Sequence, residues 1–369
     1  MSTSEADARR YARIRYRLML IELVGGLVFL LVYQLGGFST ACAQKLSRLT
    51  PVVWLQLAGY LAIFASSWWA VFSPLRFYSG FMLEHRFGLS RLTIRGWLVR
   101  EAKHLLVSGV LGLVLMEGWY ALLRAFPATW PVYATLGWVA VSVVLARMFP
   151  TWLLPIFYKT AALTDDALAR RLLALCERAK VSALGVFRMD LGVETRKANA
   201  ALAGMGRTRR VLVSDTLLER FTPEEIETIL AHELGHHRYR HITKLLCFSG
   251  IGSYAAFVLV QMLVPGWLAR LGVTGLSQIA GFPTLMLALS LIGLVGLPIQ
   301  NGISRAFEWQ ADRFVPTVVG TQAAAFASAL RRLGELNLAD PAPPRWVEWL
   351  FYDHPAIMDR INAAEHAAN

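Results

Sequence analysis

Cysteine and charge are both scarce in this chain of 369 residues. The three cysteines, Cys42, Cys176 and Cys247, are scattered and form no CxxC pair, which excludes a paired-cysteine metal or redox site. Charged residues make up only 17% of the chain against 56% hydrophobic residues, and twelve residues are Trp. This composition excludes an ordinary soluble globule and indicates a membrane protein.

Acidic residues are outnumbered by basic ones, 25 against 37, which gives a formal net charge of +12. No Gly-rich phosphate loop and no nucleic-acid motif accompanies this charge. The excess basic residues instead lie beside long apolar runs, where Lys and Arg meet anionic lipid head groups. We therefore expect membrane lipids, and no nucleic acid, as partners.

Six apolar runs are long enough to cross a bilayer, which takes about 20 mostly apolar residues. They cover residues 18–38, 52–72, 105–126, 132–158, 245–264 and 283–299. The first run is too long for the core of a signal peptide and lacks a small-residue cleavage pattern, so we expect a retained helix. The fourth run contains Pro150 and Pro155, which predict a kink or an early end. The predicted fold is mainly α, a polytopic membrane helical bundle of about six spans.

The basic residues between these runs predict an orientation. Residues 1–17 carry five Arg and the connection 73–104 carries six Lys or Arg, whereas the connection 39–51 carries two. By the positive-inside rule the N-terminus, 73–104, 159–243 and the C-terminus are cytoplasmic. The Arg-, Ala- and Leu-rich composition suggests a bacterial source. We therefore expect a multi-pass protein of the bacterial inner membrane with its site on the cytoplasmic side.

The segment His232-Glu233-Leu234-Gly235-His236 is an HExxH sequence that follows a helix-start signal. Residues 222–225 form the pattern of a capping box, with proline at the first helical position. Residues four apart share one face of a helix, so His232 and His236 can bind a single metal ion. Glu233 lies beside that face, close to the water of a catalytic zinc. We predict Glu233 as the general base of metal-assisted peptide hydrolysis.

A second histidine pair, His237 and His241, has the same spacing but offers no base, because Arg238 follows its first histidine. We interpret this pair as surface histidines or as histidines that support the metal ligands. Metzincins complete their site with a third His after a Gly, but Tyr239 and Ile242 stand at those two positions here. The metzincin class is therefore excluded.

A third ligand is still needed, since catalytic zinc usually has three protein ligands and one position for water or substrate. A Glu on a later helix is the other common solution, and Glu308 fits it, with Asp312 one turn further on. We predict one Zn²⁺ ion held by His232, His236 and Glu308. Asp312 is expected to fix a ligand histidine through its second ring nitrogen. The alternative for both acidic residues is a solvated helix face.

We predict that the segment 159–243 is the soluble part of the catalytic half. Residues 165–180 form an amphipathic helix, and residues 186–189 and 210–213 look like short strands. A loop, residues 194–209, joins these strands and contains Asn199 and Ala200. An extended edge beside a zinc helix commonly binds a peptide by strand addition, so the layout suggests a peptide substrate.

Several motifs together resemble the type I CAAX prenyl endopeptidases, integral-membrane zinc proteases that cut prenylated C-termini. The motifs lie in the family's order between about residues 52 and 361: residues 74–89, Lys197-Ala198-Asn199-Ala200, residues 210–218, the HExxH sequence, Glu308-Trp309-Gln310-Ala311-Asp312, His354-Pro355 and Arg360-Ile361. The resemblance implies a zincin-like catalytic domain of the gluzincin type with a small β-sheet.

The resemblance also assigns roles residue by residue. His232, His236 and Glu308 match the family's zinc ligands, and Glu233 matches its general base. Asn199, with Ala200 beside it, and His354 match positions at the substrate backbone and the developing oxyanion, and Asp312 matches the acidic residue after the third ligand. A large water-filled chamber enclosed by the helices is implied as well.

Two features differ from this family. It usually has seven spans where six are counted here, and nothing reads as a prenyl pocket. We expect a four-helix transmembrane part, residues 1–158, and a zinc peptidase domain, residues 159–369, interrupted by a transmembrane hairpin, residues 244–300. The substrate is expected to be a membrane-associated or C-terminal peptide, possibly lipid-modified. The alternatives are an HtpX-like quality-control protease and a non-catalytic membrane scaffold.

Overall fold

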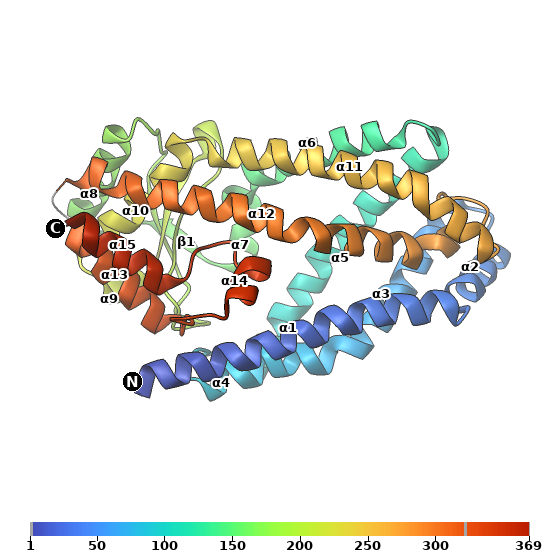
Figure 1. Ribbon diagram of the computed structural model, residues 1–369, viewed down its shortest axis with the longest axis horizontal. Helices are drawn as coiled ribbons and strands as arrows, with labels where there is room; N and C mark the ends of the chain where they lie inside the picture. Colours follow the sequence, from blue (N-terminus) through green and yellow to red (C-terminus); the bar gives the residue numbers. More distant parts are fainter. Residues whose placement is uncertain (1–2, 321–322, 369) are drawn as a thin grey trace.

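The computed structural model describes residues 3–320 and 323–368, and helices dominate it (Figure 1). Within these residues, six helical stretches are long and apolar enough to cross a membrane, which confirms the six predicted runs. The long helices are α1 Thr3–Leu35, α3 Val53–Phe77, α5 Ile94–Ala125, α6 Trp130–Met148, α11 His241–Arg270 and α12 Phe282–Val319. The predicted mainly α, polytopic fold is therefore confirmed.

The remaining elements are shorter. The helices are α2 Phe38–Leu49, α4 Leu83–Arg86, α7 Leu154–Phe157, α8 Asp166–Arg178, α9 Asp215–Arg220, α10 Pro223–Arg238, α13 Ala323–Leu336, α14 Arg345–Phe351 and α15 Ile357–Ala368. π-helical turns cover Tyr78–Met82 and Phe149–Leu153, and 3₁₀ turns cover Gly206–Thr208 and Ile279–Gly281. The strands are β1 Thr160–Ala162, β2 Val186–Met189, β3 Ala200–Ala203 and β4 Arg210–Ser214.

The predicted irregularity of the fourth span is confirmed. Helix α6 ends at Met148 and gives way to the π-helical turn that contains Pro150, before α7 ends at Phe157. A proline lacks a backbone N–H and so removes one hydrogen bond from the helical ladder, which favours an irregular turn at this point. The connection 39–51, in contrast, is not a loop, because α2 occupies most of it.

The sheet has the strand order β1-β2-β4-β3, with β2 and β4 parallel and both outer pairs antiparallel. Strands β2 and β4 confirm the two predicted strands. The prediction that residues 194–209 form only a loop is wrong, because β3 lies within them and makes one edge of the sheet. Three of the four residues of β3 are Ala, which has low intrinsic strand preference, so pairing with β4 creates this strand.

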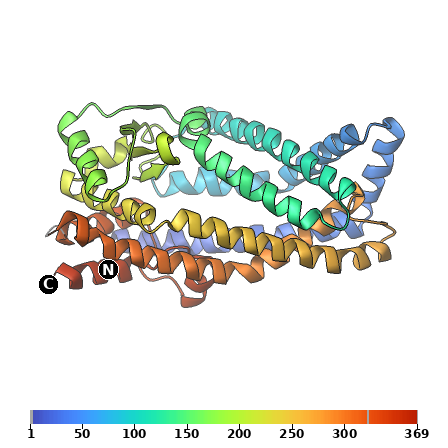
Figure 2. The ribbon, with the colours of Figure 1, turned by 90° about the horizontal axis from the view of Figure 1, so that it is seen from above.

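The sheet, helices α8 to α10 and helices α13 to α15 gather at one end of the molecule, opposite α2 (Figures 1 and 2). Both chain termini lie at this same end in both views. The HExxH helix, α10, packs against α12, α13, α8 and β3. Its capping box is present as predicted, with Thr222 Oγ1 accepting from the Glu225 amide and Glu225 Oε2 accepting from the Thr222 amide.

Close approach of α10 to α12 depends on one glycine. A Cβ at Gly235 would lie only 3.0 Å from Ala311 Cα, so any other residue would push the two helices apart here by a few tenths of an ångström. Ala311 is itself completely buried. The contact lies between His232 and His236 on one helix and Glu308 and Asp312 on the other, so it brings these side chains together.

Candidate metal centre

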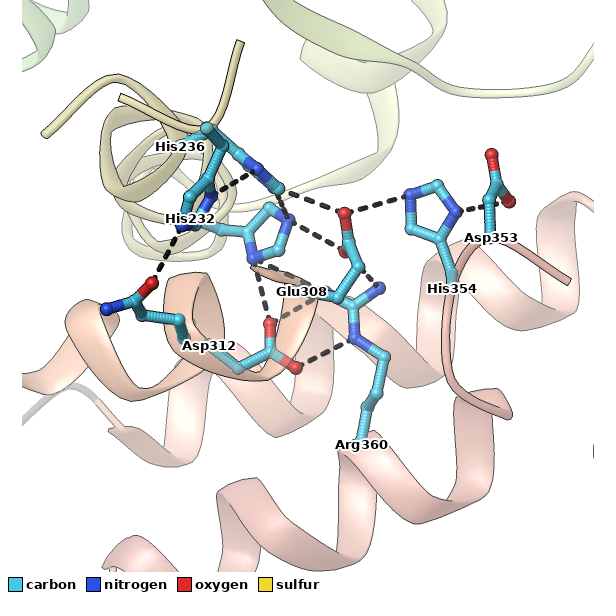
Figure 3. Close-up of polar contacts among 9 residues, drawn as sticks. His232, His236, Glu308, Asp312, Asp353, His354 and Arg360 are labelled. Atoms are coloured by element: carbon cyan, nitrogen blue, oxygen red, sulfur yellow. Dashed lines mark hydrogen bonds and ion pairs between the residues drawn. The ribbon is translucent and has the colours of Figure 1, made fainter. Parts of the chain in front are cut away.

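His232, His236 and Glu308 converge between α10 and α12 (Figure 3). His232 Nε2 lies 3.3 Å from Glu308 Oε2, His236 Nε2 lies 3.2 Å from Glu308 Oε1, and the two Nε2 atoms lie 3.1 Å apart. His232 and Glu308 are buried, and His236 is partly exposed. Three residues that are up to 76 positions apart in the chain thus point their donor atoms at one small volume.

The donor set fits a zinc ion. Ligands at about 2.0–2.1 Å from zinc in a tetrahedron lie roughly 3.3 Å from one another, close to the separations seen here. Glu308 Oε2 is buried, and the described residues give it no well-formed hydrogen bond beyond the 3.3 Å approach of His232 Nε2, so its lone pairs are available to a cation. Two imidazoles and one carboxylate also form a donor set that zinc accepts readily.

An ion-paired carboxylate holds His232 from behind. His232 Nδ1 lies 2.8 Å from Asp312 Oδ1, and Arg360 of α15 donates to both oxygens of Asp312 at 2.7 and 2.9 Å. Burial alone would lower the pKa of His232, but hydrogen bonds with Asp312 and Glu308 outweigh it and raise this pKa to about 9. Because Asp312 accepts a hydrogen bond from Nδ1, Nε2 is the nitrogen that faces Glu308 and His236 and that a metal ion would bind in place of a proton.

Two uncharged side chains in series, His241 and Gln310, support His236. His236 Nδ1 lies 3.0 Å from His241 Nδ1, and His241 Nε2 lies 2.9 Å from Gln310 Oε1. Since Gln310 Oε1 can only accept, His241 carries its proton on Nε2 and accepts the Nδ1 proton of His236. His236 Nε2 is then unprotonated and can bind a metal. His241 is therefore buried behind a predicted ligand, as one of the two sequence interpretations expects.

His237, the other histidine of the second pair, faces the sheet. Its Nε2 lies 3.1 Å from Leu202 O of β3. Burial lowers the pKa of His237 to about 4, so its ring is neutral. The same four-residue spacing therefore gives the two pairs different surroundings, because both histidines of the first pair face α12, whereas in the second pair His241 contacts α12 and His237 contacts β3.

His354 approaches Glu308 from the side opposite the two ligand histidines (Figure 3). Its Nε2 lies 3.3 Å from Glu308 Oε1, and its Nδ1 lies 2.8 Å from Asp353 Oδ1. The hydrogen bond with Asp353 raises the pKa of His354, which favours a protonated ring. Its side chain is about half exposed, so a substrate can reach it. Glu233 is partly exposed and makes no hydrogen bond or ion pair with any described residue.

The predicted substrate residues lie on the sheet edge. Strand register pairs Asn199 with Ser214, whose amide donates to Asn199 O at 3.0 Å. Because backbone groups alternate between the two sides of an antiparallel strand, the N–H and C=O of Ala200 and Leu202 face the open edge. Leu202 O is occupied by His237, whereas Ala200 keeps both groups towards the edge. The structure shows no side-chain contact of Asn199 with the other site residues that it describes.

Sequence reasoning missed three contributions. It quoted Arg360 only as part of a motif, although this residue lies 3.7 Å from Glu308 and binds Asp312. It left Gln310 unassigned within the Glu308 segment. It also missed that α1 holds the His354 loop, since Tyr16 donates to Asp340 at 2.9 Å and its hydroxyl lies 2.6 Å from that of Tyr352. Long sequence separations hide all three contacts.

A membrane helical bundle with an HExxH helix and a glutamate from a later helix at one metal-binding position defines an integral-membrane metallopeptidase. Comparison with known families gives the more specific assignment. The family model described as peptidase family M48 matches residues 162–368, and the one described as CAAX prenyl protease N-terminal, five membrane helices, matches residues 3–159. The chain belongs to peptidase family M48 and is an integral-membrane metalloendopeptidase, as the resemblance predicted.

Individual relatives agree with this assignment. The chain is 25% identical over 374 residues to a Bacillus subtilis protein named uncharacterized metalloprotease YhfN, covering 100% of this chain and 87% of that one. It is 23% identical over 330 residues to CAAX prenyl protease 1 of Saccharomyces cerevisiae, and the match covers 84% of this chain and 72% of the yeast protein. The crystal structure of S. mikatae Ste24p superposes with a TM-score of 0.88 at 23% identity, covering 98% of this chain and 89% of that chain, which shows a shared fold.

The N-terminal region departs from the family description in one respect. Its model is described as having five membrane helices, whereas the described residues between 3 and 159 contain four helices long enough to span. The predicted shortfall of one span relative to the family agrees with this difference. The additional helix in this region, α2, has only 12 residues.

Proposed function

We propose that this protein is a zinc endopeptidase in which His232, His236 and Glu308 bind the ion. The observation that carries the proposal is the set of separations of 3.1 to 3.3 Å between the two Nε2 atoms and the carboxylate oxygens of Glu308. Asp312 accepts a hydrogen bond from Nδ1 of His232, and His241 accepts one from Nδ1 of His236, which supports the same assignment. The intact donor set also argues against a membrane scaffold without catalytic activity.

Each further residue has a distinct role in the proposed reaction. Bound zinc supplies Lewis acidity, which polarises the scissile carbonyl and makes water a better nucleophile. Glu233 removes a proton from the attacking water and delivers it to the leaving amine, and its freedom from other contacts supports this role. His354 donates from Nε2 to the developing oxyanion. Asn199 and Ala200 bind the substrate backbone along the edge of β3.

The proposed substrate is a peptide that lies in extended conformation along β3. A strand edge with free N–H and C=O groups binds main chain by strand addition, which supports a peptide of relaxed sequence. Several relatives are named CAAX prenyl proteases, so we propose membrane-associated or C-terminal peptides, including lipid-modified ones. Surrounding membrane lipids are the other partners that we propose.

We further propose that the protein resides in a bacterial inner membrane with its site on the cytoplasmic side. The basic connections and the position of both termini at the site's end of the molecule support this orientation. The proposed parts are a transmembrane part, residues 1–158, and a peptidase domain, residues 159–369, interrupted by the hairpin 244–300. The two family matches, which meet near residue 160, support this division.

A cleavage assay on matched peptides tests the proposal. The purified protein is incubated with farnesylated and unmodified versions of one C-terminal peptide, with and without a zinc chelator. We expect cleavage that the chelator abolishes and that added zinc restores. Glu233→Gln should keep stoichiometric zinc and lower kcat by about 10²–10⁴-fold, because only the proton carrier is lost. Chelator-resistant cleavage, or near wild-type turnover in Glu233→Gln, would overturn the proposal.

His354 gives a second test of the mechanism. His354→Ala should lower kcat by about 10²–10³-fold with little change in zinc content, because it removes one donor to the oxyanion. Asp353→Asn is a matched variant, since it weakens only the partner of His354 and should have a smaller effect on kcat. Loss of zinc from His354→Ala would instead identify His354 as a ligand.

A further inference from the structure

A cationic pocket lies behind the metal centre, at the junction of α10 and α11. This cavity of about 440 Å³ is lined by four basic side chains, Lys180, Arg209, Arg238 and Arg240, and by no acidic one. Lys180 follows α8, Arg209 precedes β4, Arg238 is the last residue of α10 and Arg240 lies in the connection that leads into α11. None of the four forms an ion pair within the described part of the chain. Four basic residues without a paired acidic group therefore border this cavity.

Arg209 is the least satisfied of these residues. Its Nη1 donates to Ser182 O at 3.1 Å, whereas its buried Nε has no hydrogen-bond partner among the described residues. Burial lowers the pKa of Arg209 from its usual value, which means that its charge is poorly solvated. A bound anion would relieve both deficits.

Lys180 and Arg240 occupy unusual backbone positions. Both have positive φ, 56° and 55°, and they are two of only three non-glycine residues with positive φ among the described residues. Glycine commonly fills such a position after a helix because it adopts this conformation without a steric cost. Residues with long basic side chains occupy these positions instead, and both line the same pocket.

An apolar groove continues from the pocket along the first turns of α11. Its cavity of about 330 Å³ shares Arg240 and Thr243 with the cationic pocket and extends over Cys247, Phe248 and Ile251. Phe248 and Ile251 are 51% and 69% exposed, and α11 is one of the candidate membrane spans. The cationic pocket at the end of this span suits the head group of an anionic lipid, and the apolar groove along the span suits its acyl chain.

We infer that the cationic pocket and the apolar groove together bind one anionic phospholipid. The phosphate of the head group lies among Lys180, Arg209, Arg238 and Arg240, and an acyl chain follows Cys247, Phe248 and Ile251 along α11. Charge complementarity selects the head group, and the groove selects a lipid over a small phosphate compound. Since His236 also lines the pocket, the lipid would be bound directly behind the zinc helix.

Native mass spectrometry of the full-length protein in detergent tests this site. The probes are phosphatidylglycerol, phosphatidylcholine with the same acyl chains, and glycerol phosphate as the head group alone. The test variant is Arg238→Gln/Arg240→Asn, in which Asn is chosen because it tolerates a positive φ. The matched control is Arg9→Gln/Arg10→Gln, which removes the same charge from exposed residues of α1, another membrane helix.

We expect wild-type protein and the control to retain one phosphatidylglycerol molecule. The test variant should bind it at least about 10-fold more weakly. Phosphatidylcholine should not replace it, and glycerol phosphate should not displace it. Equal binding of the two lipids, equal losses in both variants, or displacement by glycerol phosphate would overturn the inference. If the test variant does not fold, Lys180→Gln should still weaken phosphatidylglycerol several-fold, and unchanged binding would be equally decisive.

Discussion

The two proposed ligand histidines, His232 and His236, are supported in opposite ways. Behind His232 lie two full charges, Asp312 and Arg360, joined by hydrogen bonds of 2.7 and 2.9 Å. Behind His236 lies a neutral chain of His241 and Gln310. Both supports fix the same tautomer, with the proton on Nδ1 and the lone pair of Nε2 directed at the site. The two supports differ in the free energy that is lost when one of their side chains is removed.

Removal of a charge is more costly than removal of a neutral partner. Taking Asp312 away leaves the Arg360 guanidinium buried without its counter-ion, and breaking such a pair costs about 3–5 kcal/mol. Loss of a neutral hydrogen bond costs about 1 kcal/mol. The comparison therefore predicts that the His232 support is more sensitive than the His236 support, although each positions one imidazole.

Asp312→Asn should have the largest effect on this comparison. It removes the charge that orients His232 and balances Arg360, so zinc affinity should fall by about 10–100-fold. Competition with a fluorescent chelator measures the affinity. In the double variant Asp312→Asn/Arg360→Met the unpaired charge is gone, so the unfolding temperature should recover while zinc affinity stays low. Wild-type zinc affinity in Asp312→Asn would show that His232 needs no carboxylate.

His241→Phe tests the neutral support. The His241 ring stacks on Phe307 at 4.3 Å and 4°, so a phenyl ring should keep the packing and lose only the acceptor for His236. Zinc affinity should fall by about tenfold, at the lower end of the range for such supporting residues. His237→Phe, which alters the neighbouring histidine that faces β3, is the control and should retain wild-type affinity. An equal loss in both variants would argue against a specific role of His241.

Gln310→Leu should have the smallest effect of the three. It leaves His241 in place but removes the acceptor that fixes its tautomer, a hydrogen bond worth about 1 kcal/mol, or about fivefold in zinc affinity. The same chelator competition measures it. A loss greater than that of His241→Phe would reverse the proposed order along the chain and contradict the tautomer assignment.

The features that the sequence predicts are those with local signals. The six spans, the capping box at Thr222 and the shared face of His232 and His236 each depend on residues within one helix. Glu308 was predicted by its residue type and by the need for a third ligand, and the structure brings it next to both histidines. Local periodicity and chemistry therefore suffice for these parts of the fold and site.

The features that could not be predicted depend on tertiary contacts. Strand β3 has an Ala-rich sequence and forms because β4 lies beside it. Arg360 reaches Asp312 across 48 positions, and His241 contacts His236 across the turn between α10 and α11, which passes through Arg240 at positive φ. No periodicity within one element encodes such contacts.

The central claim is that two imidazoles and the Glu308 carboxylate hold one zinc ion. X-ray absorption at the zinc edge, on protein reconstituted with one equivalent of zinc, tests it most directly. We predict nitrogen and oxygen neighbours at about 2.0–2.1 Å with the scattering pattern of two imidazoles, and a loss of one oxygen neighbour in Glu308→Ala. A spectrum dominated by sulfur at about 2.3 Å, or one unchanged in Glu308→Ala, would contradict the claim.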